Sequence, residues 1–318
     1  MNTNLSATYG PAEFLKRFHS PDFVNEIIRE HASILSVPIT GSCENFKKPA
    51  NKNRNRSQQY PCWDISRVVL FQINGTDYIN ANYVSGFDQP KKFIATEHPM
   101  EHTLNDFWTM VWQEYTLVIV MLSSAEEESQ PSNIRYFPYN QDETLFSDFV
   151  VKEDKIVTQP SYTETVLNII NRRTGELRTV YHFKHLDWPE DKSPDVPKFF
   201  DFLLAVNEEY QEFVHEALIT NRQFPGPIVV HGSKGIGRTS TFCAADSCLY
   251  QLVSTATISV PSIVLRVRQQ RNFSITSVRQ YIFIHMLLHC YLKKCQSNLA
   301  IFYKFRSHLT AKDIHLLI

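Results

Sequence analysis

Residues 229–240 read Val-Val-His-Gly-Ser-Lys-Gly-Ile-Gly-Arg-Thr-Ser. A short apolar strand predicted over Pro227–Val230 leads into this stretch, and a helix predicted from about residue 238 leads out of it. The three glycines between them let successive backbone N–H groups turn inward as a nest for an anion, and the helix directs its positive end at the same point. Arg238 closes the loop with a planar guanidinium that can grip two oxygens of a phosphate.

Two interpretations of this stretch compete. Glycines alone are equally typical of an ordinary turn between a strand and a helix. The order of strand, glycine nest, arginine and helix favours a phosphate-binding loop instead. The residues of this candidate loop are His231, Gly232, Ser233, Lys234, Gly235, Ile236, Gly237 and Arg238.

The loop resembles the signature loop of the classical protein tyrosine phosphatases, whose pattern is His-Cys-x5-Arg followed by Ser or Thr. Further motifs of that family follow in the family's order, from about residue 20 to about residue 293. They are Lys52-Asn53-Arg54-Asn55-Arg56, Asp64-Ile65-Ser66-Arg67-Val68, Tyr78-Ile79-Asn80-Ala81-Asn82-Tyr83, Phe93-Ile94-Ala95-Thr96, Asp106-Phe107-Trp108, Trp188-Pro189-Glu190 and Gln280-Tyr281. The resemblance implies an α/β fold, with a twisted mixed sheet flanked by helices. It also implies an N-terminal segment over 1–20, a phosphatase-like domain over 20–293 and a C-terminal tail over 294–318.

The nucleophile that this family needs has no counterpart in the sequence. Phosphoester hydrolysis through such a loop requires a thiolate whose pKa is lowered by the backbone N–H groups and the arginine. The position after His231 should therefore be cysteine, but it is Gly232. Cys243 and Cys248 lie on the following helix, and Ser233 stands one residue along the loop. Since removal of a covalent nucleophile costs on the order of 10⁶ in turnover, we assign no catalytic residue and expect no meaningful phosphatase activity.

The general-acid position also departs from the family. The resemblance places an aspartic acid after Trp-Pro, whereas this chain carries Glu190, which is one methylene longer. A glutamic acid can still donate a proton, but with a different reach. Two interpretations of Glu190 stay open: a retained acid, or a solvated acidic loop.

The clamp for a phosphotyrosine ring is missing as well. The family follows its Lys-Asn-Arg-Asn-Arg run with a tyrosine that stacks on the substrate ring and, two residues later, an aspartate that holds the peptide backbone. Those positions carry Ser57 and Gln59, which offer neither an aromatic face nor a charge, and both are interpreted as solvated loop. Tyr60 can substitute only if the loop is packed differently.

The water-positioning glutamine of the family is replaced too, by Thr276. Two supporting positions persist: Gln280 matches the family's second glutamine, and Glu127 is the candidate acid that braces Arg238. The residues that the family uses as nucleophile, general acid, ring clamp and water-positioning group are all replaced, whereas the scaffold motifs are retained. This pattern is typical of a protein that has lost catalysis.

Physical arguments about anion binding point in two directions. A glycine in place of a thiolate removes a repulsion of about 4 kcal/mol, for two unit charges about 4 Å apart at an effective dielectric constant of about 20. Lys234 either adds positive charge or is an ordinary solvated lysine. Loss of the clamp tyrosine, which would stack on the phosphotyrosine ring, weakens binding of a phosphotyrosine ligand by roughly 1–3 kcal/mol. We therefore expect small oxyanions to bind, and phosphotyrosine peptides to bind with a Kd weaker than about 1 µM.

Composition excludes several other classes of protein. The 318 residues are 43% hydrophobic and 20% charged, so the chain can bury a sizeable core. Its 33 acidic and 32 basic residues give a net charge of −1, which argues against a nucleic-acid partner. No apolar run approaches the length of a membrane span, and no signal peptide is recognised. The 12 histidines show no metal-ligand spacing, so neither a metal nor another cofactor is predicted.

Periodicity predicts the main elements. A helix is expected from Ser20-Pro21 onward, a capping pair of Thr103 and Asp106 is expected to open a helix over Leu104–Trp112, and 42–66 are expected to form a long loop. Further helices are predicted over Lys198–Phe213, 238–253, 261–270 and 277–293. Strands are predicted over Leu117–Leu122, 149–157, 162–170, 177–183 and Pro227–Val230.

A narrower resemblance concerns source and function. The runs Pro61-Cys62-Trp63-Asp64, Gly235-Ile236-Gly237-Arg238 and Thr241-Phe242-Cys243 resemble the tyrosine-phosphatase-like proteins of polydnaviruses, which parasitoid wasps deliver into insect hosts. This implies a cytoplasmic protein of the host cell that interferes with immune-cell signalling by binding an unknown protein partner, for which a tyrosine-phosphorylated protein is one candidate. The alternatives are a weak residual phosphatase with another nucleophile, and an interaction module that does not use the old pocket.

Overall fold

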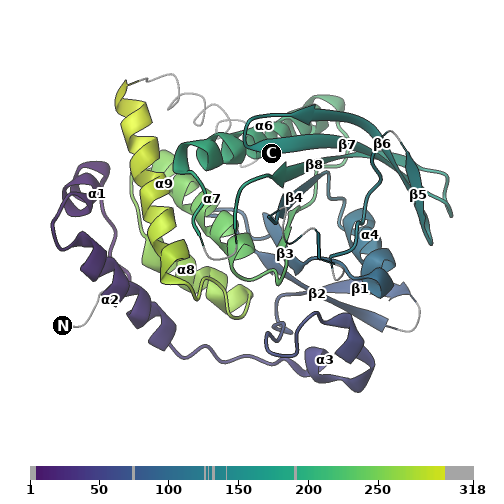
Figure 1. Cartoon of the computed structure of the whole chain (residues 1–318), viewed down its shortest axis with the longest axis horizontal. Helices are drawn as coiled ribbons and strands as arrows, with labels where there is room; N and C mark the ends of the chain where they lie inside the picture. The colour runs from purple at the N-terminus through teal and green to yellow at the C-terminus, as the bar shows by residue number, and fades with distance from the viewer. Residues whose placement is uncertain are drawn as a thin grey trace.

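The computed structural model describes residues 5–73, 76–124, 127, 129–130, 133–140, 142–189 and 192–297. Its strands form a 9-stranded mixed sheet in the order β1-β2-β3-β9-β4-β8-β7-β6-β5 (Figure 1). The strands are β1 Arg67–Ile73, β2 Thr76–Val84, β3 Phe93–Glu97, β4 Val118–Leu122, β5 Glu143–Phe146, β6 Phe149–Thr158, β7 Tyr162–Asn171, β8 Leu177–His185 and β9 Ile228–Gly232.

The centre of the sheet is parallel and its two flanks are antiparallel. Strands β3, β9, β4 and β8 run parallel, with Val230 opposite both Ala95 of β3 and Val120 of β4. Every residue of β3, β4 and β9 is buried, which is why these strands are almost continuously apolar in sequence. The parallel centre brings the carboxyl ends of these four strands to one edge, where the loop after β9 begins.

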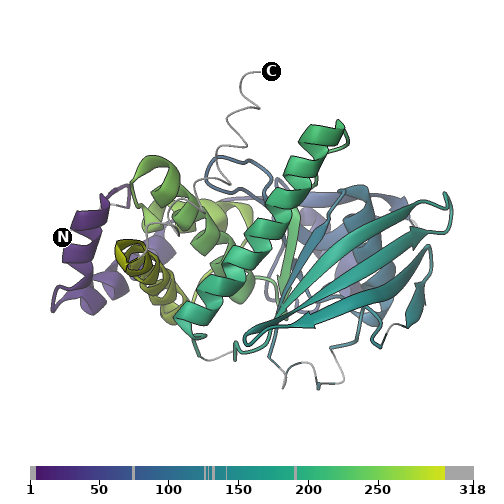
Figure 2. The same ribbon diagram turned by 90° about the horizontal axis from the view of Figure 1, so that it is seen from above.

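Helices cover both faces of this sheet (Figures 1 and 2). They are α1 Pro11–Phe18, α2 Phe23–Ser36, α3 Glu44–Lys47, α4 Leu104–Gln113, α6 Val196–Thr220, α7 Arg238–Thr255, α8 Val260–Gln270 and α9 Val278–Ser297, with 3₁₀ turns at Pro49–Arg54 and Glu101–Thr103. No helix of the described residues is both long and apolar enough to cross a bilayer.

Side-chain alternation divides the core between the two faces. Val118 and Val120 of β4 pack into the larger core beneath α6, α7, α8 and α9, whereas Ile119 and Met121 pack into the core beneath α4. Phe107 and Trp108 of α4 are buried in this second core. The helix between β9 and α8 is buried almost all round, so α7 is held rigidly behind the loop that precedes it.

The structure confirms the predicted fold class and most of the predicted elements. The strands predicted over 117–122, 149–157, 162–170, 177–183 and 227–230 correspond to β4, β6, β7, β8 and β9, and the six predicted helices correspond to α2, α4, α6, α7, α8 and α9. Strands β1, β2, β3 and β5 and helix α1 were not predicted as such.

Two local predictions were wrong. Residues 42–66 are not all loop, because they contain α3 and the 3₁₀ turn Pro49–Arg54. Asp64 stabilises α3 from a distance, since its carboxylate accepts the N–H groups of Glu44 (2.6 Å) and Asn45 (3.1 Å). Thr103 and Asp106 do not form a capping pair: the Thr103 hydroxyl accepts the N–H of Met100 (2.8 Å).

Asp106 is instead paired with Arg54, a residue of the 3₁₀ turn Pro49–Arg54. The motif Asp106-Phe107-Trp108 therefore anchors the Lys52–Arg56 segment to α4. This contact joins two of the sequence motifs that lie about 50 residues apart, which no local capping rule detects.

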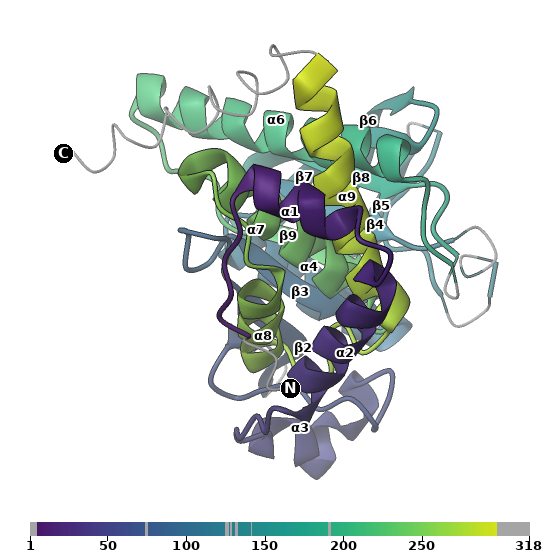
Figure 3. The same ribbon diagram turned by 90° about the vertical axis from the view of Figure 1, so that its left-hand side faces the viewer.

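The domain boundaries predicted near residues 20 and 293 lie within segments that pack against the rest of the protein. Phe14 of α1 belongs to the larger core, and Tyr9 exchanges backbone hydrogen bonds of 2.9 and 2.8 Å with Ile258. Figure 3 shows α1 and α2 lying along the outer side of α9. Helix α9 continues to Ser297, and the rest of the predicted tail, 298–318, lies outside the described residues.

Candidate functional site

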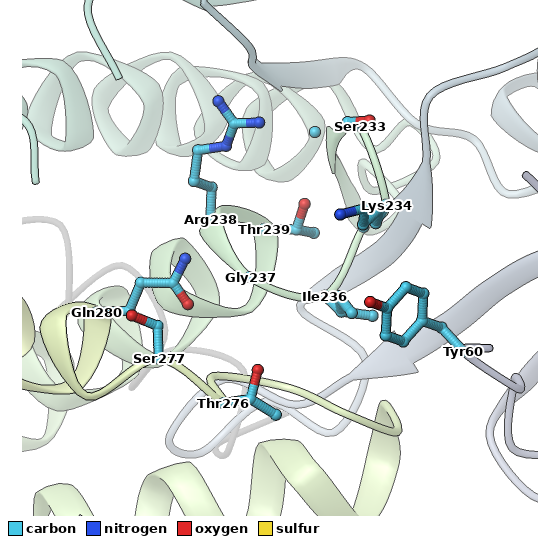
Figure 4. Close-up of a pocket in the computed structure, with 12 residues that line it drawn as sticks. Tyr60, Ser233, Lys234, Ile236, Gly237, Arg238, Thr239, Thr276, Ser277 and Gln280 are labelled. Carbon is cyan, nitrogen blue, oxygen red and sulfur yellow. The ribbon is translucent and has the colours of Figure 1, made fainter. Parts of the chain in front are cut away.

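The loop between β9 and α7 lines a pocket of about 210 Å³ at the carboxyl edge of the parallel strands (Figure 4). His231 and Gly232 end β9, and α7 begins at Arg238. The pocket residues come from this loop and the start of α7, from the segment before β1, and from the residues just before and at the start of α9. They are Tyr60, Gly232, Ser233, Lys234, Gly235, Ile236, Gly237, Arg238, Thr239, Thr276, Ser277 and Gln280.

Glycine is required at the middle of the loop. Gly235 has φ +66°, and a Cβ atom there would lie 2.2 Å from the carbonyl oxygen of Thr96. The loop therefore lies directly against the end of β3. Because Gly235 allows this close approach, the backbone between Gly232 and Arg238 can curl around a single point.

At the floor of the pocket, Gly232 leaves space beside two polar groups. A Cβ atom at this position would point between the Thr239 Oγ1 atom (3.5 Å) and the Arg238 Nε atom (3.9 Å). It would also lie 2.9 Å from the Leu122 carbonyl oxygen, which is closer than a Cβ contact normally allows. Position 232 thus faces the groups that would surround a bound anion. The Leu122 carbonyl lies so close that it would crowd any side chain at this position.

Arg238 is buried and held from two sides. Its Nη1 donates to the Trp188 carbonyl (2.7 Å), and its Nη2 forms an ion pair with Glu127. Burial acts to raise the pKa of Glu127, but the hydrogen bonds from Arg238 and from the Ser124 N–H (2.9 Å) outweigh it and hold that pKa below its usual range. The predicted brace between Glu127 and Arg238 is therefore confirmed.

Thr239 supplies an unused donor at the same floor. The residue is 1% exposed, and its hydroxyl has no hydrogen-bond partner among the described residues. A buried hydroxyl without a partner is unfavourable by about 1–3 kcal/mol, so this group would gain from an acceptor placed over Gly232.

No described cysteine takes over the nucleophile position. Cys243 and Cys248 are buried in α7, and burial raises the pKa of both thiols. A thiol with a raised pKa stays protonated and unreactive at neutral pH. The nearest hydroxyl in the loop, that of Ser233, lines the pocket but belongs to the next residue along the chain.

Behind the loop lies a buried cluster of neutral histidines. Tyr136 Oη is 2.6 Å from Nε2 of His231 and 2.6 Å from Nε2 of His182, and the His98 ring stands beside both Tyr136 and His231. Burial lowers the pKa of His182 to about 3 and that of His98 to about 4, and it lowers the pKa of His231 well below its usual value. The cluster therefore supports β9 by packing and hydrogen bonds between uncharged groups.

This cluster predicts a loss of stability in acid. A histidine whose pKa is lowered on folding takes up a proton more readily when unfolded, so its contribution is full above about pH 6.5 and falls as the pH drops towards the folded value. At pH 5 we expect His182 to have lost about 2 kcal/mol of its contribution to the free energy of unfolding. Urea unfolding at pH 7.5 and pH 5 measures this loss.

The control is His182→Gln, which keeps a group that can bond Tyr136 but cannot titrate. Glu97, whose pKa burial raises to about 8, acts in the opposite sense in both proteins, so the comparison cancels it. The variant should lose less stability between the two pH values than the parent. Equal losses would contradict the role of His182.

Arg271 is a supporting residue that sequence reasoning missed. It is buried, its Nε donates to the Gly235 carbonyl (3.0 Å), and its Nη1 donates to the side chains of Asn80 (2.7 Å) and Asn82 (2.8 Å). Asn80 and Asn82 stand two residues apart in the motif Tyr78–Tyr83, and this spacing is the sequence signal that could have pointed to such a support. They and Arg271 fasten the loop between β9 and α7 to the sheet.

Of the other predicted site residues, some line the pocket and some do not. Thr276 and Gln280 line the pocket, whereas Ser57 and Gln59 do not, and the Ser57 hydroxyl accepts the N–H of Gln59 (3.2 Å). Glu190, the general-acid position, lies outside the described residues. Among the described residues no group of three or more histidine, cysteine, aspartate or glutamate side chains is placed to hold a metal ion.

Comparison with known proteins gives consistent matches. Residues 51–290 match the family model described as protein-tyrosine phosphatase. The chain is 33% identical to tyrosine phosphatase H2 of Microplitis demolitor bracovirus (isolate Webb), over 88% of each chain. It is 34% identical to tyrosine phosphatase-like protein J1 of the same virus, over 82% of this chain and 89% of the relative. It is 37% identical to the human tyrosine-protein phosphatase non-receptor type 9, over 83% of this chain and 46% of the relative.

Proposed function

The chain belongs to the protein tyrosine phosphatase family, and we propose that it binds an oxyanion in the loop 231–238 without hydrolysing a phosphoester. The loop keeps the backbone curl, the arginine and the helix start that bind a phosphate. It carries no thiolate, because the residue at the nucleophile position is Gly232. On this view the protein is a binding module built on a phosphatase scaffold.

The observation that carries the proposal is the floor of the pocket. The space over Gly232 is bordered by the Thr239 hydroxyl, which has no partner among the described residues, and by the Arg238 guanidinium, which is fixed by Glu127 and Trp188. An anion there would accept hydrogen bonds from both. The anion would also be spared the repulsion of about 4 kcal/mol that a cysteine thiolate about 4 Å away would exert in an active phosphatase.

The biological role follows from the absence of turnover. A protein that holds a phosphorylated group without releasing it can shield a phosphorylated partner or compete with an active phosphatase. The similarity to bracovirus proteins supports a viral origin for this chain. With the resemblance in the sequence, it leads us to propose a role in an infected host cell, where the protein would act on immune-cell signalling from the cytoplasm. The partner in this proposal is a protein that carries a phosphate monoester.

The rival function is residual catalysis, which is favoured by the names of the bracovirus relatives, since they include tyrosine phosphatases H2 and H3. In that case another group, such as a water activated by Glu190, would replace the thiolate. The two functions differ in one measurable respect, because only the rival predicts turnover that depends on Arg238.

The test combines binding with turnover on the full chain. Isothermal titration calorimetry with inorganic phosphate and with sulfate should show one site, and hydrolysis of a chromogenic aryl phosphate should not exceed the rate without protein. Hydrolysis that disappears in Arg238→Ala would support the rival enzyme. Absence of both binding and hydrolysis would show that the function uses another surface.

A further inference from the structure

Tyr60 occupies a place on the pocket wall that its position in the sequence does not predict. It stands three residues beyond Ser57, the position of the family's ring clamp, yet Tyr60 lines the pocket and Ser57 does not. Figure 4 shows its ring on the side of the loop opposite Gln280, with the phenol oxygen directed towards Ile236. The pocket therefore has an aromatic wall from a different residue.

A second aromatic residue fixes the Tyr60 ring. Phe273, from the turn between α8 and α9, packs edge-on against Tyr60, with ring centroids 5.6 Å apart and an angle of 75° between the planes. Phe273 has φ +56°, an unusual backbone conformation for a bulky residue. Such strain costs of order 1–3 kcal/mol and persists where the surroundings enforce it. Segments more than 200 residues apart thus meet at the rim and hold one ring in place.

The rim and the floor of the pocket have complementary chemistry. The floor offers the Arg238 guanidinium and the loop N–H groups, whereas the rim offers the Tyr60 ring with the Lys234 ammonium 5.9 Å from its centroid. A ligand whose phosphoryl group binds at the floor would extend past Tyr60 towards the pocket opening. A flat, apolar group in that position would be in contact with the aromatic ring.

We propose that Tyr60, held by Phe273, makes this pocket selective for aryl phosphate monoesters over alkyl and inorganic phosphates. The inference rests on the proposed function, because it requires that the phosphoryl group binds at the loop. It assigns to Tyr60 the ring contact that Ser57 cannot make. Tyr60 is a specificity-determining residue in this proposal and takes no part in any bond change.

The experiment compares three ligands that share one phosphoryl group: inorganic phosphate, methyl phosphate and phenyl phosphate. Calorimetry on the full chain should show phenyl phosphate binding about 10-fold more tightly than methyl phosphate. Tyr60→Ala should remove that preference and leave the affinity for inorganic phosphate within roughly 2-fold of the parent value. Tyr60→Phe should keep the preference, and the matched control Ser57→Ala should change neither affinity.

The outcomes separate this inference from the proposed function. If inorganic phosphate fails to bind the parent, the proposed function itself is wrong. If it binds but phenyl and methyl phosphate bind equally, only the role of Tyr60 is overturned. Tighter binding of phenyl phosphate to Tyr60→Ala would also overturn it, since the ring would then be an obstruction. Tyr60→Leu, which keeps apolar bulk without an aromatic face, serves if the alanine variant does not fold.

The source of the aryl phosphate is tested with a phosphotyrosine peptide. We expect the peptide to bind within about 3-fold of phenyl phosphate, because Gln59 is exposed and makes no contribution to the pocket lining. Such a result supports a ligand carried by a protein. Exclusion of the peptide while phenyl phosphate still binds would overturn the protein source and would support a small aryl phosphate.

Discussion

The Arg238→Ala variant is expected to bind inorganic phosphate at least about 100-fold more weakly than the parent, a loss of about 2.7 kcal/mol. The guanidinium is the charged group at the pocket floor that is already oriented, since Trp188 and Glu127 fix it before any anion arrives. Alanine removes the charge and the fixed donors together. Calorimetric titration with phosphate measures the loss directly.

The same substitution should lower stability. It would leave Glu127, which is 7% exposed, with no ion-pair partner in a buried setting, and breaking a buried pair costs about 3–5 kcal/mol. Loss of binding could therefore reflect partial unfolding, which urea denaturation would reveal. The control is the double variant Arg238→Met with Glu127→Leu, which removes both charges and should recover much of the stability but none of the binding.

Arg238→Lys is the charge-conserving comparison. A lysine ammonium cannot replace a planar fork that contacts Trp188, Glu127 and an anion at once, so its affinity should lie between those of the parent and Arg238→Ala. A folded Arg238→Ala protein that binds phosphate as tightly as the parent would place the anion somewhere other than this loop.

Local patterns in the sequence were enough to predict β4 and β9, two of the strands at the centre of the fold. The apolar run in β4 and the short apolar strand β9 are recognisable because a parallel strand buried on both faces must be apolar at every position. The strand, loop and helix around residues 229–240 were predicted for a related reason, since the short apolar strand, the glycines, the arginine and the helix start are adjacent in sequence. The pairing of Glu127 with Arg238 came from the family resemblance and is confirmed by the structure.

What the sequence did not reveal depends on contacts between distant segments. Asp64 caps α3 from 20 residues away, and the bond from Arg271 to the Gly235 carbonyl spans 36 residues. No periodicity or spacing rule links such positions. The helix α3 was therefore missed, and Arg271 was not recognised as a support of the loop.

The pocket rim shows the same limitation at the functional site. Counting along the chain identified Ser57 and Gln59 as degenerate clamp positions, but it could not show that Tyr60 would face the pocket. Tyr60 lines the pocket with Phe273 packed against it from beyond α8, a contact that counting along the chain does not reveal. The expectation that the site lacks an aromatic face therefore holds for Ser57 alone.

Restoring the missing nucleophile tests how much of the scaffold remains. The Gly232→Cys variant should hydrolyse an aryl phosphate at least about 10³-fold faster than the parent, against a full nucleophile effect on the order of 10⁶. Its side chain would start 3.5 Å from the Thr239 hydroxyl and 3.9 Å from Arg238 Nε, surroundings that lower a thiol pKa. The gain should stay below the full effect because Thr276 stands where the family has its water-positioning glutamine.

The steric penalty at position 232 makes Gly232→Ala the necessary control. Alanine brings the same Cβ atom to 2.9 Å from the Leu122 carbonyl, so both variants should lose about 1–3 kcal/mol of stability by overpacking. Only the cysteine adds a thiolate, which should weaken phosphate binding through like-charge repulsion while it confers turnover. If both variants fold and bind phosphate alike and neither turns over, the loop is an anion site that needs more than a nucleophile to become an enzyme. If the parent already turns over as fast as Gly232→Cys, the thiolate was never the missing part, and catalysis by another group must be sought.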